Sequence, residues 1–95
     1  MRKKLKWYYE REEEIILVGY YYGIDNKCGY PLFENLTNMK TLEILNHIHI
    51  LTKDIIAYES LNDETTYIIR GYVTIYERKD GTKDYGLKEV IIEEI

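Results

Sequence analysis

The last third of the chain constrains the fold most, because it predicts a long β-hairpin. Residues 66–79 alternate between two faces and are rich in β-branched and aromatic residues, a composition typical of strands. Asp80-Gly81 lies in a charged tip and supplies the positive φ angles that a type I′ turn requires. We therefore expect residues 66–95 to form two paired antiparallel strands.

The register and the second arm of this hairpin leave alternatives open. A two-residue turn pairs Tyr76 with Tyr85, whereas a shift by one residue pairs Ile75 with Leu87, and a bulge near residues 86–89 reconciles the two. Residues 87–95 also fit a helical stripe. The hairpin context and three adjacent β-branched residues favour a strand.

Upstream of the hairpin, the pattern predicts three shorter strands and a long loop. Residues 5–9 alternate loosely, residues 15–22 are apolar on both faces as in a central strand, and residues 53–60 hold another apolar run. Glycines, Asp-Asn and the only proline mark residues 23–35 as a loop. Loops of this length are often functional.

Residues 36–52 are the one expected helix. Thr37 or Asn38 can cap its start, and a helical stripe follows with Met39, Leu42, Leu45, His49 and Thr52. The competing interpretation is a strand at residues 44–51. We favour the helix because the sheet otherwise lacks a covering element. The expected fold is α+β: an antiparallel sheet of about five strands, in the order ββ-α-βββ, with one helix packed on it in a single domain over residues 1–95.

Composition narrows the class of protein. The net charge of −4 argues against general affinity for nucleic acid or anionic membranes. Cys28 is the only cysteine, so no internal disulfide can form. No apolar run approaches the roughly 18 residues that span a bilayer, and we expect a cytoplasmic protein, in the host cytoplasm if it is viral. Abundant Ile, Lys, Glu and Tyr without Gln fits a thermophile or an AT-rich genome equally well.

The candidate chemistry is sparse. Cys28, His47 and His49 are the weak candidates for a metal site. Two histidines two residues apart share a face on a strand, but on the expected helix they point about 200° apart and cannot chelate together. Cys28 beside Lys27 could be a reactive thiol, although lone loop cysteines are mostly inert. We therefore expect no catalytic residues, no metal and no cofactor.

The most distinctive expected surface lies on the hairpin. Its inner stripe holds Tyr67, Ile69 and Val73, and the opposite face alternates Arg with Tyr. Both types are enriched at binding hot spots, and they can also stack on bases; the alternative is cross-strand pairing on a solvated sheet. Eleven tyrosines cannot all be buried with their hydroxyls satisfied. The expected binding surface comprises Arg70, Tyr72, Tyr76, Arg78, Tyr20, Tyr22, Glu10, Glu12, Glu13 and Glu14.

These features predict a small non-enzymatic protein-binding module. In size, composition and lack of motif, the chain looks like small proteins encoded by viruses of AT-rich bacteria or thermophilic archaea. Many of those bind and block a host protein, CRISPR effectors and other defence nucleases among them, so the likeness implies a host nuclease or nucleic-acid-binding effector as partner. A homodimer is a further expectation. The alternatives are a nucleic-acid-binding protein that uses the Arg/Tyr face and a small enzyme or nucleotide-binding protein built at residues 23–35.

Overall fold

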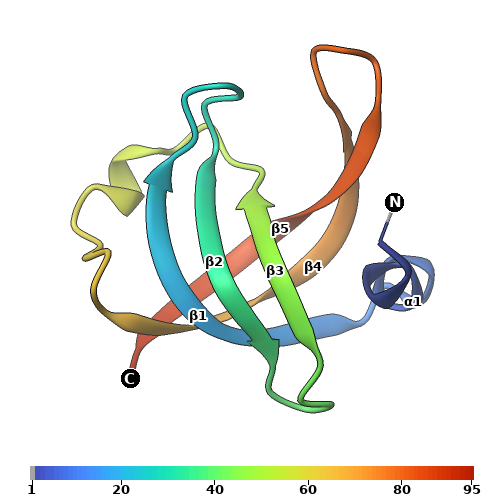
Figure 1. Ribbon diagram of the computed structural model, residues 1–95, viewed down its shortest axis with the longest axis horizontal. Coiled ribbons are helices and arrows are strands. Elements are labelled where there is room, and N and C mark those ends of the chain that lie inside the picture. The colour runs from blue at the N-terminus through green and yellow to red at the C-terminus, as the bar shows by residue number, and fades with distance from the viewer. Residues whose placement is uncertain (1) are drawn as a thin grey trace.

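The computed structural model describes residues 2–95 and consists of one helix, a five-stranded barrel and a short 3₁₀ turn (Figure 1). The helix opens the chain and the two longest strands close it. The elements are α1 (Lys3–Arg11), β1 (Glu14–Ile24), β2 (Pro31–Asn38), β3 (Ile44–Ile50), η1 (Ile56–Tyr58), β4 (Thr66–Glu77) and β5 (Lys83–Glu94). The α+β class is confirmed, with mostly β content.

The sheet closes on itself in the order β1-β2-β3-β5-β4. Four of its seams are antiparallel, as expected, but β3 and β5 run parallel and pair only at His49↔Gly86 and Ile50↔Leu87. The expected number of strands and the single helix are confirmed, but the sheet is a closed mixed barrel rather than antiparallel throughout, and the order ββ-α-βββ is wrong because the helix comes first. A closed barrel holds its core inside, so no helix covers a face of the sheet; the one helix lies instead at the short β3–β5 seam and adds Leu5 and Tyr8 to the core.

The β4–β5 hairpin is confirmed, with a register that differs from both expectations. Tyr76 pairs with Asp84 and Ile75 with Tyr85. In the tip, the Arg78 amide donates to the Thr82 carbonyl at 2.7 Å, and Gly81 alone has a positive φ, of 86°. This is a three-residue loop that ends in a glycine bulge, so the type I′ prediction was wrong.

A bulge near the middle of β5 is confirmed. The register shifts by one residue between Arg70 and Tyr72, where Glu89 has a φ of 53°. Gly71 faces this bulge, and a Cβ there would lie 3.0 Å from the carbonyl oxygen of Lys88. The close approach of the two strands therefore favours glycine at this position.

The expected helix at 36–52 was wrong, since these residues end β2, turn and form β3. The Asn38 side chain does what was expected of a helix cap: its Oδ1 accepts from the amides of Lys40 and Thr41 at 2.9 and 3.3 Å. The same chemistry can instead begin a turn. Leu42 then adopts a φ of 64°, which ends any helix, and β3 pairs with β2.

Three other expected elements need correction. Residues 5–9 belong to α1 rather than to a strand, with Leu5 and Tyr8 buried and Trp7 exposed. Residues 53–60 contain η1 rather than a strand. The loop expected at 23–35 is shorter, because β1 runs to Ile24 and Pro31 begins β2, an end position where a strand tolerates proline.

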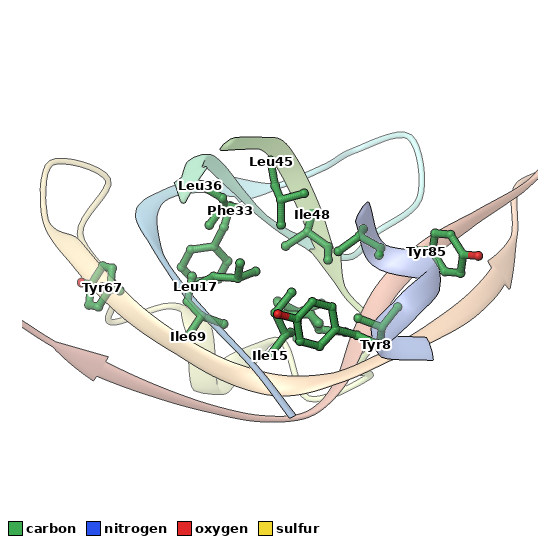
Figure 2. Packing of buried hydrophobic residues seen from close by; sticks show 14 of the residues in the cluster. Tyr8, Ile15, Leu17, Phe33, Leu36, Leu45, Ile48, Tyr67, Ile69 and Tyr85 are labelled. Atoms are coloured by element: carbon green, nitrogen blue, oxygen red, sulfur yellow. The ribbon is translucent and has the colours of Figure 1, made fainter. Parts of the chain in front are cut away.

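Helix α1 closes the barrel where β3 and β5 diverge. The Arg2 guanidinium donates to the carbonyls of His47 in β3 and Tyr85 in β5. The Lys4 ammonium donates to the Ile44 carbonyl at 3.0 Å. Inside, Leu5 and Tyr8 join a core of aromatic and aliphatic side chains from the strands (Figure 2). Among residues 2–95, no helix is long and apolar enough to cross a membrane.

Candidate functional site

The structure places most of the expected binding residues in or beside two regions, while Glu13 and the exposed Tyr22 belong to neither. The first is the outer surface of β1, β4 and β5. Tyr72 pairs with Glu14, Arg70 with Ile16 and with Ile91. These pairs extend along the strands, and we call this surface the sheet face; its residues are Glu14, Ile16, Val18, Tyr20, Thr66, Ile68, Arg70, Tyr72 and Ile91.

The centre of the sheet face is apolar around one arginine. Ile16, Val18 and Ile68 are half-buried, and Ile91 is 52% exposed. Among them, the Nε atom of Arg70 is buried and has no hydrogen-bond partner within residues 2–95. A buried donor without a partner lowers stability, so the Nε atom of Arg70 does not stabilise the barrel.

Acidic groups border one end of the sheet face. Glu10 and Glu12, at the end of α1, line a hollow of about 500 Å³ together with Tyr72 and Lys88. Glu13 lies apart from it and pairs with Lys40 at 3.7 Å. Three glutamates of the expected acidic run therefore lie near Tyr72. Glu10 and Glu12 share the hollow with it, and Glu14 is its pairing partner on β1.

The second region is a cleft of about 430 Å³ between the β1–β2 loop and the hairpin tip. Both loops lie at the same end of the barrel (Figure 1). We call it the loop cleft; its lining residues are Asp25, Lys27, Cys28, Tyr30, His49, Tyr76, Glu77, Arg78, Lys79 and Asp80. Tyr76 and Arg78, expected beside Arg70 and Tyr72, belong here instead.

The β1–β2 loop is a tight turn centred on Asp25. The Asp25 amide donates to the Tyr30 carbonyl at 2.9 Å, and the amides of Cys28 and Gly29 donate to the Asp25 carbonyl. The Lys27 amide donates to the Asp25 carboxylate at 3.0 Å. Gly29 has a φ of 80°, a conformation that favours glycine. These bonds hold Asp25 and Cys28 in a fixed relation.

His49 connects the loop to the hairpin. Its Nε2 lies 2.8 Å from the Asp25 carboxylate and its Nδ1 lies 3.1 Å from the Tyr76 hydroxyl. Tyr76 reaches it across β5, where His49 pairs with Gly86, a residue without a side chain. The hydrogen bond from His49, followed by the one from the Lys27 amide, lowers the pKa of the Asp25 carboxyl.

A second charged group lies beside this network. The Asp84 carboxylate, 7% exposed, is 2.6 Å from the Arg78 guanidinium and 3.7 Å from that of Arg2. Burial lowers the pKa of Arg2, although Asp84 opposes the shift. Arg78 is thus bound to Asp84 at the edge of the cleft, and Arg2, which precedes α1, pairs with the same carboxylate.

This arrangement brings together two of the three weak metal candidates, Cys28 and His49. Because β3 is a strand, the objection from helical geometry no longer applies. His49 and Cys28 meet in the cleft, but His47 does not join them; its ring centre is 6.0 Å from that of His49. Asp25 takes its place, and the two-residue spacing between Asp25 and Cys28 was the sequence signal that could have found it.

A nucleophilic role for Cys28 finds little support in this geometry. Both ring nitrogens of His49 already have partners, so the imidazole would have to break a bond before it could accept the thiol proton. An activated cysteine needs such a base or a lowered thiol pKa. The cleft is better described as a set of ligand atoms than as a catalytic pair.

No protein-family model, curated protein or solved structure matches this chain. Function therefore has to be argued from the geometry of the two regions.

Proposed function

We propose that the protein is a non-enzymatic binding module that contacts another protein through the sheet face. The observation that carries this is Arg70, whose Nε is buried and unpaired in the middle of an apolar surface. Arginine and tyrosine dominate binding hot spots, which cluster at the centre of an interface and are desolvated there. A partner carboxylate or carbonyl would supply the missing hydrogen bond after the guanidinium turns outward, because Nε has almost no surface open to solvent where it now lies.

Charge at the border of the face supports a partner with basic groups. Glu10, Glu12 and Glu14 lie on the Tyr72 side, with Lys88 the cation among them. Complementary charges at an interface rim mainly raise the association rate and fix orientation. A nuclease or other nucleic-acid-binding effector offers such a basic surface, and occupying it would block its nucleic acid. We therefore retain a virus-encoded inhibitor of a host defence protein as the specific form of the proposal.

The test measures affinity for purified effector nucleases by biolayer interferometry, using wild-type protein and two variants. Arg70→Ala should weaken binding at least roughly 30-fold, the effect of a hot spot of about 2 kcal/mol. Lys79→Ala, in the loop cleft, is the matched control and should leave binding unchanged. Equal losses in both variants, with unchanged melting temperatures, would place the contact elsewhere.

A second copy of this chain is the competing occupant of the face. Sedimentation velocity of the purified protein distinguishes it, because a dimer through the face would dissociate in Arg70→Ala. If wild-type protein is a dimer of this kind, the face serves self-association and the hetero-partner proposal fails.

Nucleic acid is the second candidate, favoured by the position of the loop cleft. The strand order, with a parallel β3–β5 closure, is the connectivity of OB-fold barrels. Such barrels bind oligonucleotides or oligosaccharides on strands 2 and 3 and between the loops that join strands 1–2 and 4–5. The cleft lies between these loops, and Tyr30 and Tyr76 line it, 6.0 Å apart between ring centres. Aromatic rings of this kind stack on bases.

Fluorescence anisotropy of a labelled single-stranded oligonucleotide tests this candidate. Binding should fall as salt rises and should be lost in Tyr30→Ala, while Arg70→Ala leaves it intact. Competition by a mononucleotide alone would instead support the third alternative, a nucleotide-binding protein at residues 23–35. No salt-sensitive binding at low ionic strength would exclude the nucleic-acid candidate.

A further inference from the structure

Three side chains with different ligand chemistry converge in the loop cleft. A carboxylate oxygen of Asp25, the sulfur of Cys28 and a ring nitrogen of His49 all lie within 4.8 Å of one another. We propose that these residues bind one Zn²⁺ ion and leave its fourth coordination position open to the cleft. This site is separate from the sheet face and does not depend on the function proposed for it.

The donor set favours zinc over Ca²⁺ and Mg²⁺. Zn²⁺ accepts thiolate, imidazole and carboxylate ligands together, whereas Ca²⁺ and Mg²⁺ prefer oxygen ligands only. Asp25 and Cys28 are separated by two residues in one tight turn, the spacing that paired zinc ligands commonly use. His49 comes from a different strand, so the ion would join the β1–β2 loop to the wall of the barrel.

The ligand atoms lie within 4.8 Å of one another, so zinc binding requires movements of about half an ångström to at most about 1.2 Å. Zinc lies about 2.3 Å from sulfur and about 2.0–2.2 Å from nitrogen or oxygen, so tetrahedral ligand atoms stand about 3.3–3.6 Å apart. The Asp25 oxygen and His49 Nε2 now lie 2.8 Å apart and would separate by about half an ångström on this geometry. The ion takes the place of their hydrogen bond.

Two of the ligands are oriented before the ion arrives. Metal-bound histidines usually donate the other ring N–H to an oxygen, which fixes the tautomer. The Tyr76 hydroxyl lies 3.1 Å from Nδ1 of His49 and can accept this bond, so that Nε2 faces the ion. The second oxygen of Asp25 is held by the Lys27 amide, and His49 is only 11% exposed.

The charges and protons balance for Zn²⁺. Cys28 gives up its thiol proton to solvent when it becomes a ligand. Neutral His49 keeps one proton, which moves from Nε2 to Nδ1 if Nε2 carried it. The thiolate and the Asp25 carboxylate then neutralise the two positive charges, so the occupied site beside Lys27 and Arg78 is neutral, whereas the empty site carries the single negative charge of Asp25. One proton is released for each ion bound when His49 starts neutral.

The test is a zinc titration of the untagged, chelator-treated full chain against a chromophoric chelator at pH 7. We expect one ion per chain with a dissociation constant below about 1 μM. Cys28→Ala should weaken binding at least roughly 100-fold, and Tyr76→Phe about 10- to 100-fold through loss of the histidine's orienting bond. His47→Ala, with its ring beside the site but outside the cluster, is the matched control and should bind as wild type.

A cobalt titration supplies the second readout. Co²⁺ in the wild-type site should show a thiolate-to-metal charge-transfer band that is absent from Cys28→Ala. Circular dichroism verifies that each variant is folded, and Cys28 lies in a partly exposed turn, where the change to alanine leaves the core untouched. A wild-type dissociation constant above about 1 μM, or equal affinities for Cys28→Ala and His47→Ala, would overturn the proposal.

Discussion

The sheet face and the loop cleft satisfy their polar groups in opposite ways. In the cleft, His49 has a partner at both ring nitrogens and Asp84 is held by two arginines. On the sheet face, Arg70 is partly buried with its Nε unpaired. A satisfied network holds side chains in place, whereas an unsatisfied donor in an apolar surface suits a group that meets its partner from outside. The first region is organised like a binding centre for a small group, and the second like half of an interface.

Leu5→Ala tests whether the sheet face and the loop cleft both depend on helix α1. Of the substitutions considered, it should lower the free energy of unfolding most. Leu5 is fully buried where α1 closes the barrel, so its truncation should lower the free energy of unfolding by about 3 kcal/mol. Urea denaturation measures the change. Trp7→Ala, exposed on the same helix, is the control and should cost less than half as much.

If α1 joins the two regions, Leu5→Ala should also weaken both protein binding and zinc binding. The helix carries Glu10 toward Tyr72 and holds Arg2 near Asp84. Loss of stability with both activities intact would show that the barrel positions each region without the helix.

The loss of stability at alkaline pH should be of intermediate size, and it concerns Tyr58, which lies outside both the sheet face and the loop cleft. Burial raises the pKa of Tyr58 to about 12, above the value near 10 of the unfolded chain. Stability from the neutral phenol is thus fully present below pH 10 and is lost as pH rises toward 12, amounting to about 2 kcal/mol. Unfolding followed between pH 9 and about 12 should show a shallower decline in Tyr58→Phe.

The exposed Tyr22 provides the control for this measurement, because Tyr22→Phe alters a side chain that is 59% exposed. Its pH profile should match that of wild type. A decline of equal slope in Tyr58→Phe and wild type would mean that other phenols, such as Tyr21 with its burial-raised pKa, carry the effect.

Arg70→Leu should give the smallest change in the free energy of unfolding, and it should be an increase rather than a decrease. Replacing a buried unpaired donor by an apolar side chain of the sheet face should raise the free energy of unfolding by about 0.5–1 kcal/mol. The same change should abolish the proposed partner binding. Thermal denaturation with a binding assay checks both; a loss of stability would indicate that Arg70 supports the barrel.

The sheet face could be predicted from the sequence to a greater extent than the loop cleft. The alternation of residues 66–77 predicted that Arg70 and Tyr72 lie on the outer side, because strand periodicity depends on local spacing alone. The pairing of this face with β1 was not visible. The cleft was harder still, since Asp25, His49 and Tyr76 are each more than 20 residues apart and meet only when the barrel closes.

The failed helix at 36–52 has a similar cause. Asn38 has the side chain of a helix cap, and a helical stripe was expected to follow it. Of that stripe, Leu45 and His49 are buried in β3, whereas Met39 and Leu42 lie in the preceding turn and are exposed. Local propensity did not distinguish a helix from two strands joined by a turn, and pairing with β1 and β5 decided it.

The sequence by itself determined the long closing hairpin, the central strand that follows α1 and the inner stripe of β4, because each rests on a period-two pattern within one segment. The tertiary structure decided the closure of the sheet, the role of α1 as its plug and the meeting of Asp25, Cys28 and His49. These depend on which strands become neighbours. The parallel β3–β5 seam joins segments 37 residues apart in the chain, and the free energy of closing it comes from the shared core rather than from any local pattern.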